Sequence, residues 1–143
     1  MTSNWRDERG SAAVEITMVA PVLALFILLI IFGGRLALAR QAVHSAAFDA
    51  ARAASLARTQ TDARTAAAKT AAATLANQKL PCTTTQLELD TTGFAKPVGT
   101  PATVTVRLAC NVATGDLGLP GIAATVPVDA EATSPLDVYR ERK

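Results

Sequence analysis

The stretch Arg9-Gly-Ser-Ala-Ala-Val-Glu15, followed at once by the charge-free run 16–34, determines how the rest of the chain is interpreted. Moving an ionised carboxylate from water into hydrocarbon is unfavourable, so Glu15 at the edge of such a run needs a reason. At 1.5 Å per residue the run is about 28 Å long. That length is close to one hydrocarbon thickness. The run therefore predicts a helix that crosses a membrane.

Residues 1–10 form a short polar leader, which could begin a secretory signal. The apolar run is longer than a typical signal core and ends without a convincing small-x-small cleavage site, so we expect a retained transmembrane helix over 11–34. Equal numbers of arginines flank the run on its two sides, so the positive-inside rule does not set its orientation. Both cysteines lie beyond the run, and an oxidising compartment on that side sets the expected orientation. We expect a cytoplasmic N-terminus and an extracytoplasmic C-terminal part, reached by a single pass.

Residues 35–80 contain neither Pro nor Gly and are rich in Ala, which predicts that the helix continues until Pro81. Small side chains recur along one face at intervals of three and four, and this Ala seam comprises Leu36, Ala39, Val43, Ala46, Ala50, Ala53 and Ala57. Such a seam permits close helix-to-helix approach. Because the Ala-rich helix carries few large apolar side chains, packing against another subunit is favoured. The alternative is a helix lying on its own domain.

Beyond Pro81 the hydrophobic period changes to two, which is typical of strands. The expected strands are 85–90, 102–110 and 122–132, separated by segments rich in Gly and Pro. The clearest alternation places Val104, Val106, Leu108 and Cys110 on one face. We expect an α+β fold in which a small three-stranded antiparallel sheet, within a domain over 81–133, follows the long helix. A charged tail over 134–143 completes the chain.

Cys82 and Cys110 form an even pair in a domain too small to be secure without a covalent link. A disulfide between them is the favoured interpretation, with two free buried thiols as the alternative. Closing a loop of this length stabilises a fold by roughly 3–4 kcal/mol in the chain-entropy model.

Composition and motifs argue against several classes of function. The 14 basic and 12 acidic side chains give a net charge of +2, too balanced to indicate nucleic-acid binding. His44 is the single histidine, and the sequence holds no phosphate loop, hydrolase elbow or zinc-protease motif. We therefore expect no enzyme activity, cofactor, metal or small-molecule substrate.

Several motifs together resemble the TadE-like minor pilins of tight-adherence (Tad/Flp) type IV pili. They are the stretch from Arg9 to Glu15, Pro21 within the apolar run, Phe32-Gly33 near its end, Ala39-Arg-Gln-Ala-Val43 and Ala51-Arg-Ala-Ala54. The resemblance covers about the first 55 residues, and Ser134-Pro-Leu-Asp-Val-Tyr-Arg140 is similar to the family at the other end. Ile16 and Ile31 depart from it, where relatives often carry an aromatic and an acidic residue.

The resemblance implies that a prepilin peptidase cuts after Gly10, so that Ser11 becomes the N-terminus and the apolar helix survives. It also implies an assembly contact for Glu15, whose carboxylate would offset the charge of an amine. The alternative for Glu15 is an acidic residue stabilised by the helix dipole. The implied partners are other pilin or pseudopilin subunits, the Tad assembly platform, the prepilin peptidase and membrane lipid, at the bacterial cell membrane. The rival interpretation is a signal-anchored extracytoplasmic binding protein outside any filament, which would remain unprocessed.

Overall fold

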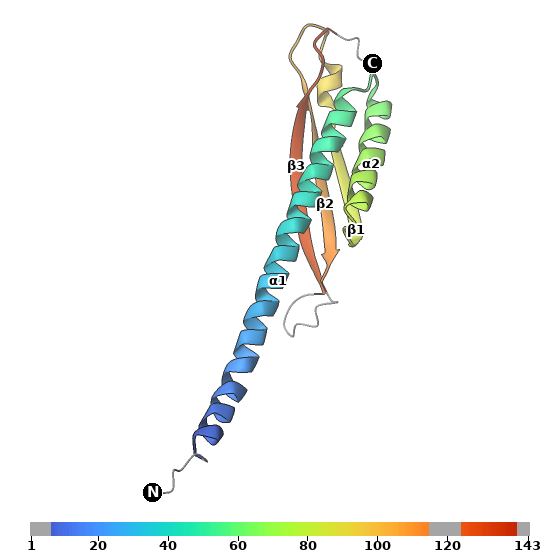
Figure 1. Ribbon diagram of the computed structural model, residues 1–143. Coiled ribbons are helices and arrows are strands. Elements are labelled where there is room, and N and C mark those ends of the chain that lie inside the picture. Colours follow the sequence, from blue (N-terminus) through green and yellow to red (C-terminus); the bar gives the residue numbers. More distant parts are fainter. Residues whose placement is uncertain (1–6, 115–123, 140–143) are drawn as a thin grey trace, which may run out of the picture. The chain divides into compact units, whose positions relative to one another are not determined.

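The computed structural model describes the backbone of residues 7–114 and 124–139, and side chains in these ranges from residue 16 onward. In chain order these ranges form α1 (Asp7–Ser55), α2 (Gln60–Asn77), β1 (Cys82–Asp90), the 3₁₀ helix η1 (Thr92–Ala95), β2 (Thr103–Ala113) and β3 (Thr125–Pro135) (Figure 1). The expected α+β fold, with a long apolar N-terminal helix and a three-stranded antiparallel sheet, is confirmed. The chain divides into two compact units, Met1–Leu36 and Ala37–Lys143.

The Ala-rich segment forms two helices, whereas its composition predicted one. α1 ends at Ser55, and α2 begins after Thr59, whose extended backbone (φ −122°, ψ 156°) breaks the helical path. The Thr59 hydroxyl oxygen accepts a hydrogen bond from the Asp62 backbone N–H at 3.1 Å, so it caps α2. Thr-x-x-Asp is close to the capping-box pattern, which was the one sequence signal for this break.

α2 ends before Pro81, at a turn that closes on its own last carbonyls. The backbone N–H of Leu80 donates to the Leu75 carbonyl oxygen at 3.3 Å, and that of Lys79 donates to the Ala76 carbonyl oxygen at 3.0 Å. This pair of bonds is the Schellman arrangement, which needs a left-handed residue. Lys79 supplies it with φ 53°, at a position where glycine is the usual residue.

The second unit has two layers. Both α2 and the part of α1 from Ala37 onward lie along one face of the sheet (Figure 1). The two helices lie side by side, and the Thr74 hydroxyl of α2 donates a hydrogen bond to the Asp49 carboxylate of α1 at 3.1 Å. The Ser134 hydroxyl on β3 donates to that of Ser55 on α1 at 3.0 Å. The opposite face of the sheet is open to solvent.

The sheet has the order β1-β2-β3, with both pairings antiparallel. Alternate residues of the central strand β2 are buried against the helices: Val104, Val106, Leu108, Cys110 and Val112. This is the face that the alternation predicted. β1 and β2 are longer than expected, and β3 ends three residues later than expected. Residues 122 and 123 of the third expected strand lie outside the described residues.

One end of the sheet, where β2 begins and β3 ends, is covered by η1 and by the segment after β3. We call it the distal end. Phe94 of η1 and Leu136 after β3 are buried, and the Leu136 backbone N–H donates to the Ala102 carbonyl oxygen at 2.9 Å. The Gly99 backbone N–H donates to the Val138 carbonyl oxygen at 2.8 Å. The beginning of the expected charged tail is therefore part of the domain, and residues 140–143 lie outside the described residues.

Candidate membrane anchor and assembly surface

The first unit presents an apolar helix surface with no covering within the described residues. Helix Ile16–Ser55 contains a window long and apolar enough to cross a membrane, with a mean hydropathy of 2.8 and 0% of its residues buried. Large side chains such as Ile16, Phe26 and Leu29 are about two-thirds exposed or slightly less, at 66%, 58% and 60%. Exposed apolar surface on this scale needs lipid or a partner to cover it. It indicates a membrane anchor.

Pro21 lies inside α1 without ending it. Proline removes one backbone donor from a helix, and membrane helices accommodate it when neighbouring groups satisfy the freed carbonyl. The helix continues unbroken to Ser55.

The expected processing and contact residues are placed only by their backbone. Gly10, Ser11 and Glu15 all lie within α1, which begins at Asp7. Their side chains lie outside those that the structure describes. Cleavage after Gly10 and an assembly contact by Glu15 therefore stay predictions.

From Ala39 onward, the Ala seam is covered inside the second unit. Val43, Ala46 and Ala50 are 0% exposed and Ala39 is 2% exposed, because the sheet and α2 cover this side of α1. The favoured expectation that these residues face another subunit is therefore wrong. The alternative, a helix lying on its own domain, is the one observed. The seam permits close approach of α1 to its own sheet, where a larger side chain would not fit.

A different face of α1, not predicted from the sequence, is left open in the second unit. Leu38 is 72% exposed and Phe48 is 53% exposed. They belong to a row with spacings of three and four that we call the outward row: Leu38, Gln41, Ser45, Phe48 and Arg52. Such spacing is typical of a helix that pairs with another helix. The sequence feature that could have identified this face is the pair of large apolar residues Leu38 and Phe48, on the side opposite the alanines.

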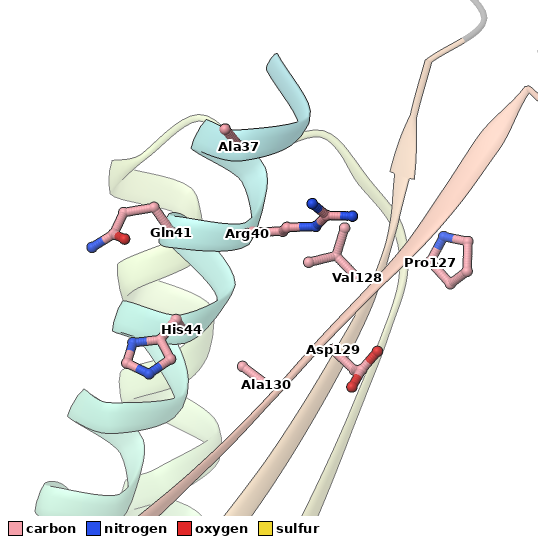
Figure 2. Close-up of a pocket in the computed structure, with 8 residues that line it drawn as sticks. All are labelled: Ala37, Arg40, Gln41, His44, Pro127, Val128, Asp129 and Ala130. Atoms are coloured by element: carbon pink, nitrogen blue, oxygen red, sulfur yellow. The ribbon is translucent and has the colours of Figure 1, made fainter. Parts of the chain in front are cut away.

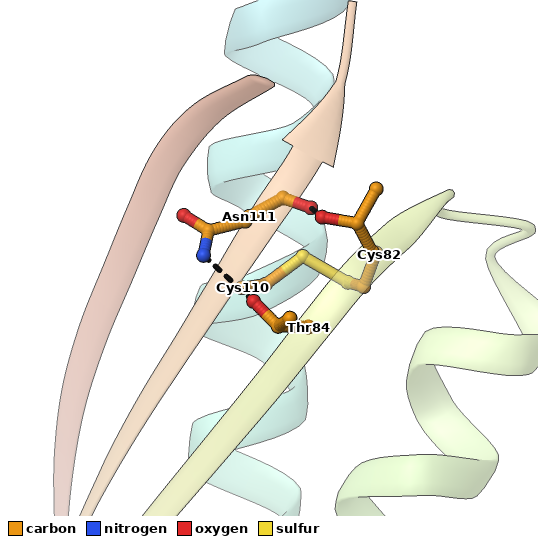
Figure 3. Close-up of a disulfide and its surroundings, with 5 residues drawn as sticks. Cys82, Thr84, Cys110 and Asn111 are labelled. Atoms are coloured by element: carbon orange, nitrogen blue, oxygen red, sulfur yellow. Dashed lines mark hydrogen bonds between the residues drawn. A yellow bond between two sulfur atoms is a disulfide. The ribbon is translucent and has the colours of Figure 1, made fainter. Parts of the chain in front are cut away.

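Cys82 and Cys110 form the predicted disulfide, with their Cα atoms 5.5 Å apart (Figure 3). It joins the first residue of β1 to the central strand, next to the irregularity in register between Cys82 and Thr84. Two hydrogen bonds hold this junction: the Thr83 hydroxyl donates to the Asn111 carbonyl oxygen at 3.0 Å, and the Asn111 amide donates to the Thr84 hydroxyl oxygen at 2.7 Å. The disulfide thus fixes the chain where it leaves α2 and enters the sheet.

The open face of the sheet is polar and internally paired. Arg107 on β2 forms an ion pair with Glu131 on β3, with 2.7 Å between Nε and Oε2, which raises the pKa of Arg107. On β1, the Thr92 backbone N–H donates to the Asp90 carboxylate at 2.9 Å and lowers the pKa of that carboxyl. The Thr105 and Thr133 hydroxyls lie 3.0 Å apart. No group of three or more metal-ligating side chains occurs within the described ranges.

These features define a protein with one candidate membrane-spanning helix and a small disulfide-linked α+β domain built on the same helix. The family model for TadE-like proteins matches residues 10–52. This match over the N-terminal part of the chain supports a TadE-like protein of the Tad pilus system. That family is structural and its members act with other components of the pilus system. Neither a curated protein nor a solved structure matches the chain significantly.

Proposed function

We propose that this protein is a minor pilin: a structural subunit anchored by the apolar part of α1, processed at its leader and packed against partner pilins. The observation that carries the proposal is the family match, which begins at Gly10 and runs through the apolar helix to residue 52. The matched segment therefore starts where cleavage is expected, and it leaves out the polar residues before that point.

Processing fits the chemistry of the leader. A glycine before the scissile bond has no side chain to obstruct a protease cleft, and it unwinds from a helix more easily than other residues except proline. Cleavage there gives Ser11 a new α-amine close to the carboxylate of Glu15. In an assembly, that carboxylate offsets the charge of an amine on its own chain or on a neighbour. The prepilin peptidase and the Tad assembly platform are the partners that this route requires.

Packing against other subunits uses the exposed surface of α1. Because the Ala seam is covered by the protein's own sheet, the outward row is the helix face that remains for a partner helix in the second unit. Leu38 and Phe48 provide its large apolar contacts. The sheet domain, held by its disulfide, would then lie on the extracytoplasmic side.

One experiment tests processing and assembly together. The full chain is expressed in piliated cells, and the mature protein is purified for intact-mass spectrometry and for pull-down of the pilus subunits. We expect a mature chain beginning at Ser11, and we expect Glu15→Ala to leave membrane insertion intact while reducing recovery of partner pilins at least about 10-fold, as for loss of a buried charge pair. Glu88→Ala, a change at an exposed sheet residue, is the matched control and should co-purify normally.

The two readouts separate the possible failures. A native chain that keeps Met1 or Thr2 would count against processing and favour the signal-anchored binding protein. A correctly processed Glu15→Ala variant that still recovers its partners would remove the charge contact and leave the pilin assignment in place.

A further inference from the structure

The sheet of the second unit has two edge strands, β1 and β3, which differ in how open they are to further pairing. An edge strand presents unpaired backbone N–H and C=O groups, to which another strand can bond. We propose that the free edge of β1 binds an extended segment of a partner protein whose apolar and basic residues alternate. This site is separate from the outward row and does not depend on assembly into a pilus, so it can fail or hold independently of the proposed function.

Hydrogen bonds at the two ends of β2 show which backbone groups point away from the sheet. The Leu136 N–H donates to the Ala102 carbonyl oxygen at 2.9 Å. At the other end, the Thr114 N–H donates to the Ala124 carbonyl oxygen at 2.9 Å. Every second residue of an antiparallel strand bonds the same neighbour, so in this register the even-numbered residues of β2 and β3 bond each other. The odd-numbered residues of β3 therefore direct their backbone groups toward the free edge.

The same reasoning assigns the groups of β1. The odd-numbered residues of β2 bond β1, and from Thr84 onward their partners on β1 are even-numbered. The odd-numbered residues Thr85, Leu87 and Leu89 therefore direct their N–H and C=O groups outward. The sheet order ends at β1, so within the described ranges no further strand pairs with these groups.

Two prolines close the free edge of β3. Pro127 and Pro135 are odd-numbered, so the backbone nitrogen that lacks a hydrogen faces outward in each. Figure 2 shows the ring of Pro127 and the carboxylate of Asp129 on the side of β3 away from α1. Proline and charged side chains on an edge strand oppose pairing with another chain. β1 contains no proline over its nine residues, so it is the open edge.

Apolar side chains at the edge of β1 are incompletely covered. Leu87 and Leu89 pair with the buried residues Leu108 and Val106, so they face the helices, yet both are only partly buried. Thr85 lies on the same side and is exposed, which shows that α2 does not cover the edge there. A strand added to β1 would place alternate side chains beside the two leucines. Apolar residues at those positions would complete the covering of Leu87 and Leu89.

The other face of β1 selects for basic residues. Glu88 and Asp90 are exposed on the open side of the sheet, and the nearby Arg107 is already paired with Glu131 at 2.7 Å. Opposite charges on adjacent strands are favourable and like charges are unfavourable. The β1 of a second copy would bring the same carboxylates to this face, so a segment with basic residues is the better match. Exposed ion pairs add little affinity, so they select the partner, while backbone bonds and the leucines hold it.

The test uses the full chain, isotopically labelled for NMR, in maltoside micelles. The probe is a peptide of nine residues, the length of β1, in which valine and lysine alternate. Its binding should be saturable. At about ten times its Kd, it should slow hydrogen exchange of the Thr85, Leu87 and Leu89 amides about 10-fold, because about nine-tenths of the protein is then bound. The outward amides of Asp129 and Glu131, on the other edge, should exchange as before.

Matched variants and peptides test each part of the argument. Thr85→Pro removes an outward N–H without removing a bond to β2, and it should weaken peptide binding about 10-fold or more. Thr133→Pro makes the same change at an outward position of β3 and should bind normally. Methylation of the valine nitrogens removes the peptide donors that face β1, so this peptide should not bind. A peptide with glutamate in place of lysine should bind about 10-fold more weakly.

The proposal is overturned if the methylated or the glutamate peptide binds as tightly as the lysine peptide, or if Thr85→Pro binds normally. It is also overturned if the lysine peptide shows no saturable binding or protects Asp129 and Glu131 in place of the β1 amides. Protection of the β1 amides that increases with protein concentration, without any peptide, would assign this edge to a second copy of the chain and would overturn the proposal as well.

Discussion

At the scale of single residues, the distal end of the domain depends on a position where only glycine fits. Gly93 in η1 is buried, and a Cβ added there would overlap the carbonyl oxygen of Thr103 and come within 3.1 Å of Leu136 Cδ1. The oxygen belongs to the backbone at the start of β2, so it cannot move aside as a flexible side chain would. Gly93 thus permits η1 to lie against the sheet and the segment after β3.

Gly93→Ala should therefore destabilise the second unit by about 1–3 kcal/mol, the usual effect of overpacking a close contact. Hydrogen exchange of the β2 amides, measured by mass spectrometry on the full chain in detergent, gives the change in unfolding free energy. Faster exchange confined to η1, with β2 unchanged, would show that the distal contact is not coupled to the sheet. Unaltered exchange throughout would contradict the steric argument.

At the scale of elements, α1 is one helix with two different environments. Through residues 16–34 it shows large apolar side chains to its surroundings, and from Ala39 onward it buries small ones against the sheet and α2. Alanine at the buried positions lets helix and sheet approach closely, which large side chains would prevent.

Ala50→Leu should destabilise the second unit by about 1–3 kcal/mol, because Ala50 is 0% exposed and its neighbours leave no room for three more carbons. Ala68→Leu, on the exposed side of α2, is the control and should change stability by less than about 0.5 kcal/mol. Thermal unfolding followed by circular dichroism compares the two. Equal melting temperatures would mean that α1 is loosely packed at this point.

At the scale of the whole molecule, a covalent link compensates for a small core. The buried side chains of the second unit are largely alanine and valine, and its largest fully buried residue is Leu108. Domains of this size often rely on disulfides for part of their stability. The bond between Cys82 and Cys110, 28 residues apart, ties the exit of α2 to the central strand.

Replacing both cysteines by alanine should lower the unfolding free energy by about 3–4 kcal/mol in the chain-entropy model. The measurement is chemical unfolding of the second unit within the full chain, with the reduced unaltered protein as the comparison. Both cysteines of the folded protein should also resist thiol labelling until a reductant is added. Immediate labelling, or a double variant as stable as the parent, would contradict this role.

Much of this architecture could be predicted because local patterns of hydrophobic residues specify it. The apolar run, the change of period after Pro81 and the alternation in β2 each reflect which side chains must leave water, so they identified the candidate membrane helix, the sheet and its buried face. The two cysteines could be paired because no other partner exists in the sequence. The expected roles of Gly10 and Glu15 rest on the family pattern and stay predictions.

Tertiary structure decided the rest, because periodicity shows that a face is small or apolar without saying what covers it. The Ala seam suits either a partner helix, which was the favoured expectation, or the protein's own sheet, and only the fold showed that its own domain covers it. The same fold left Leu38 and Phe48 exposed, and it brought Arg40 beside residues 127–130, far away in the sequence. The sequence by itself determined which side chains tend to leave water, and the packing of α1 on the sheet determined which of them stay exposed.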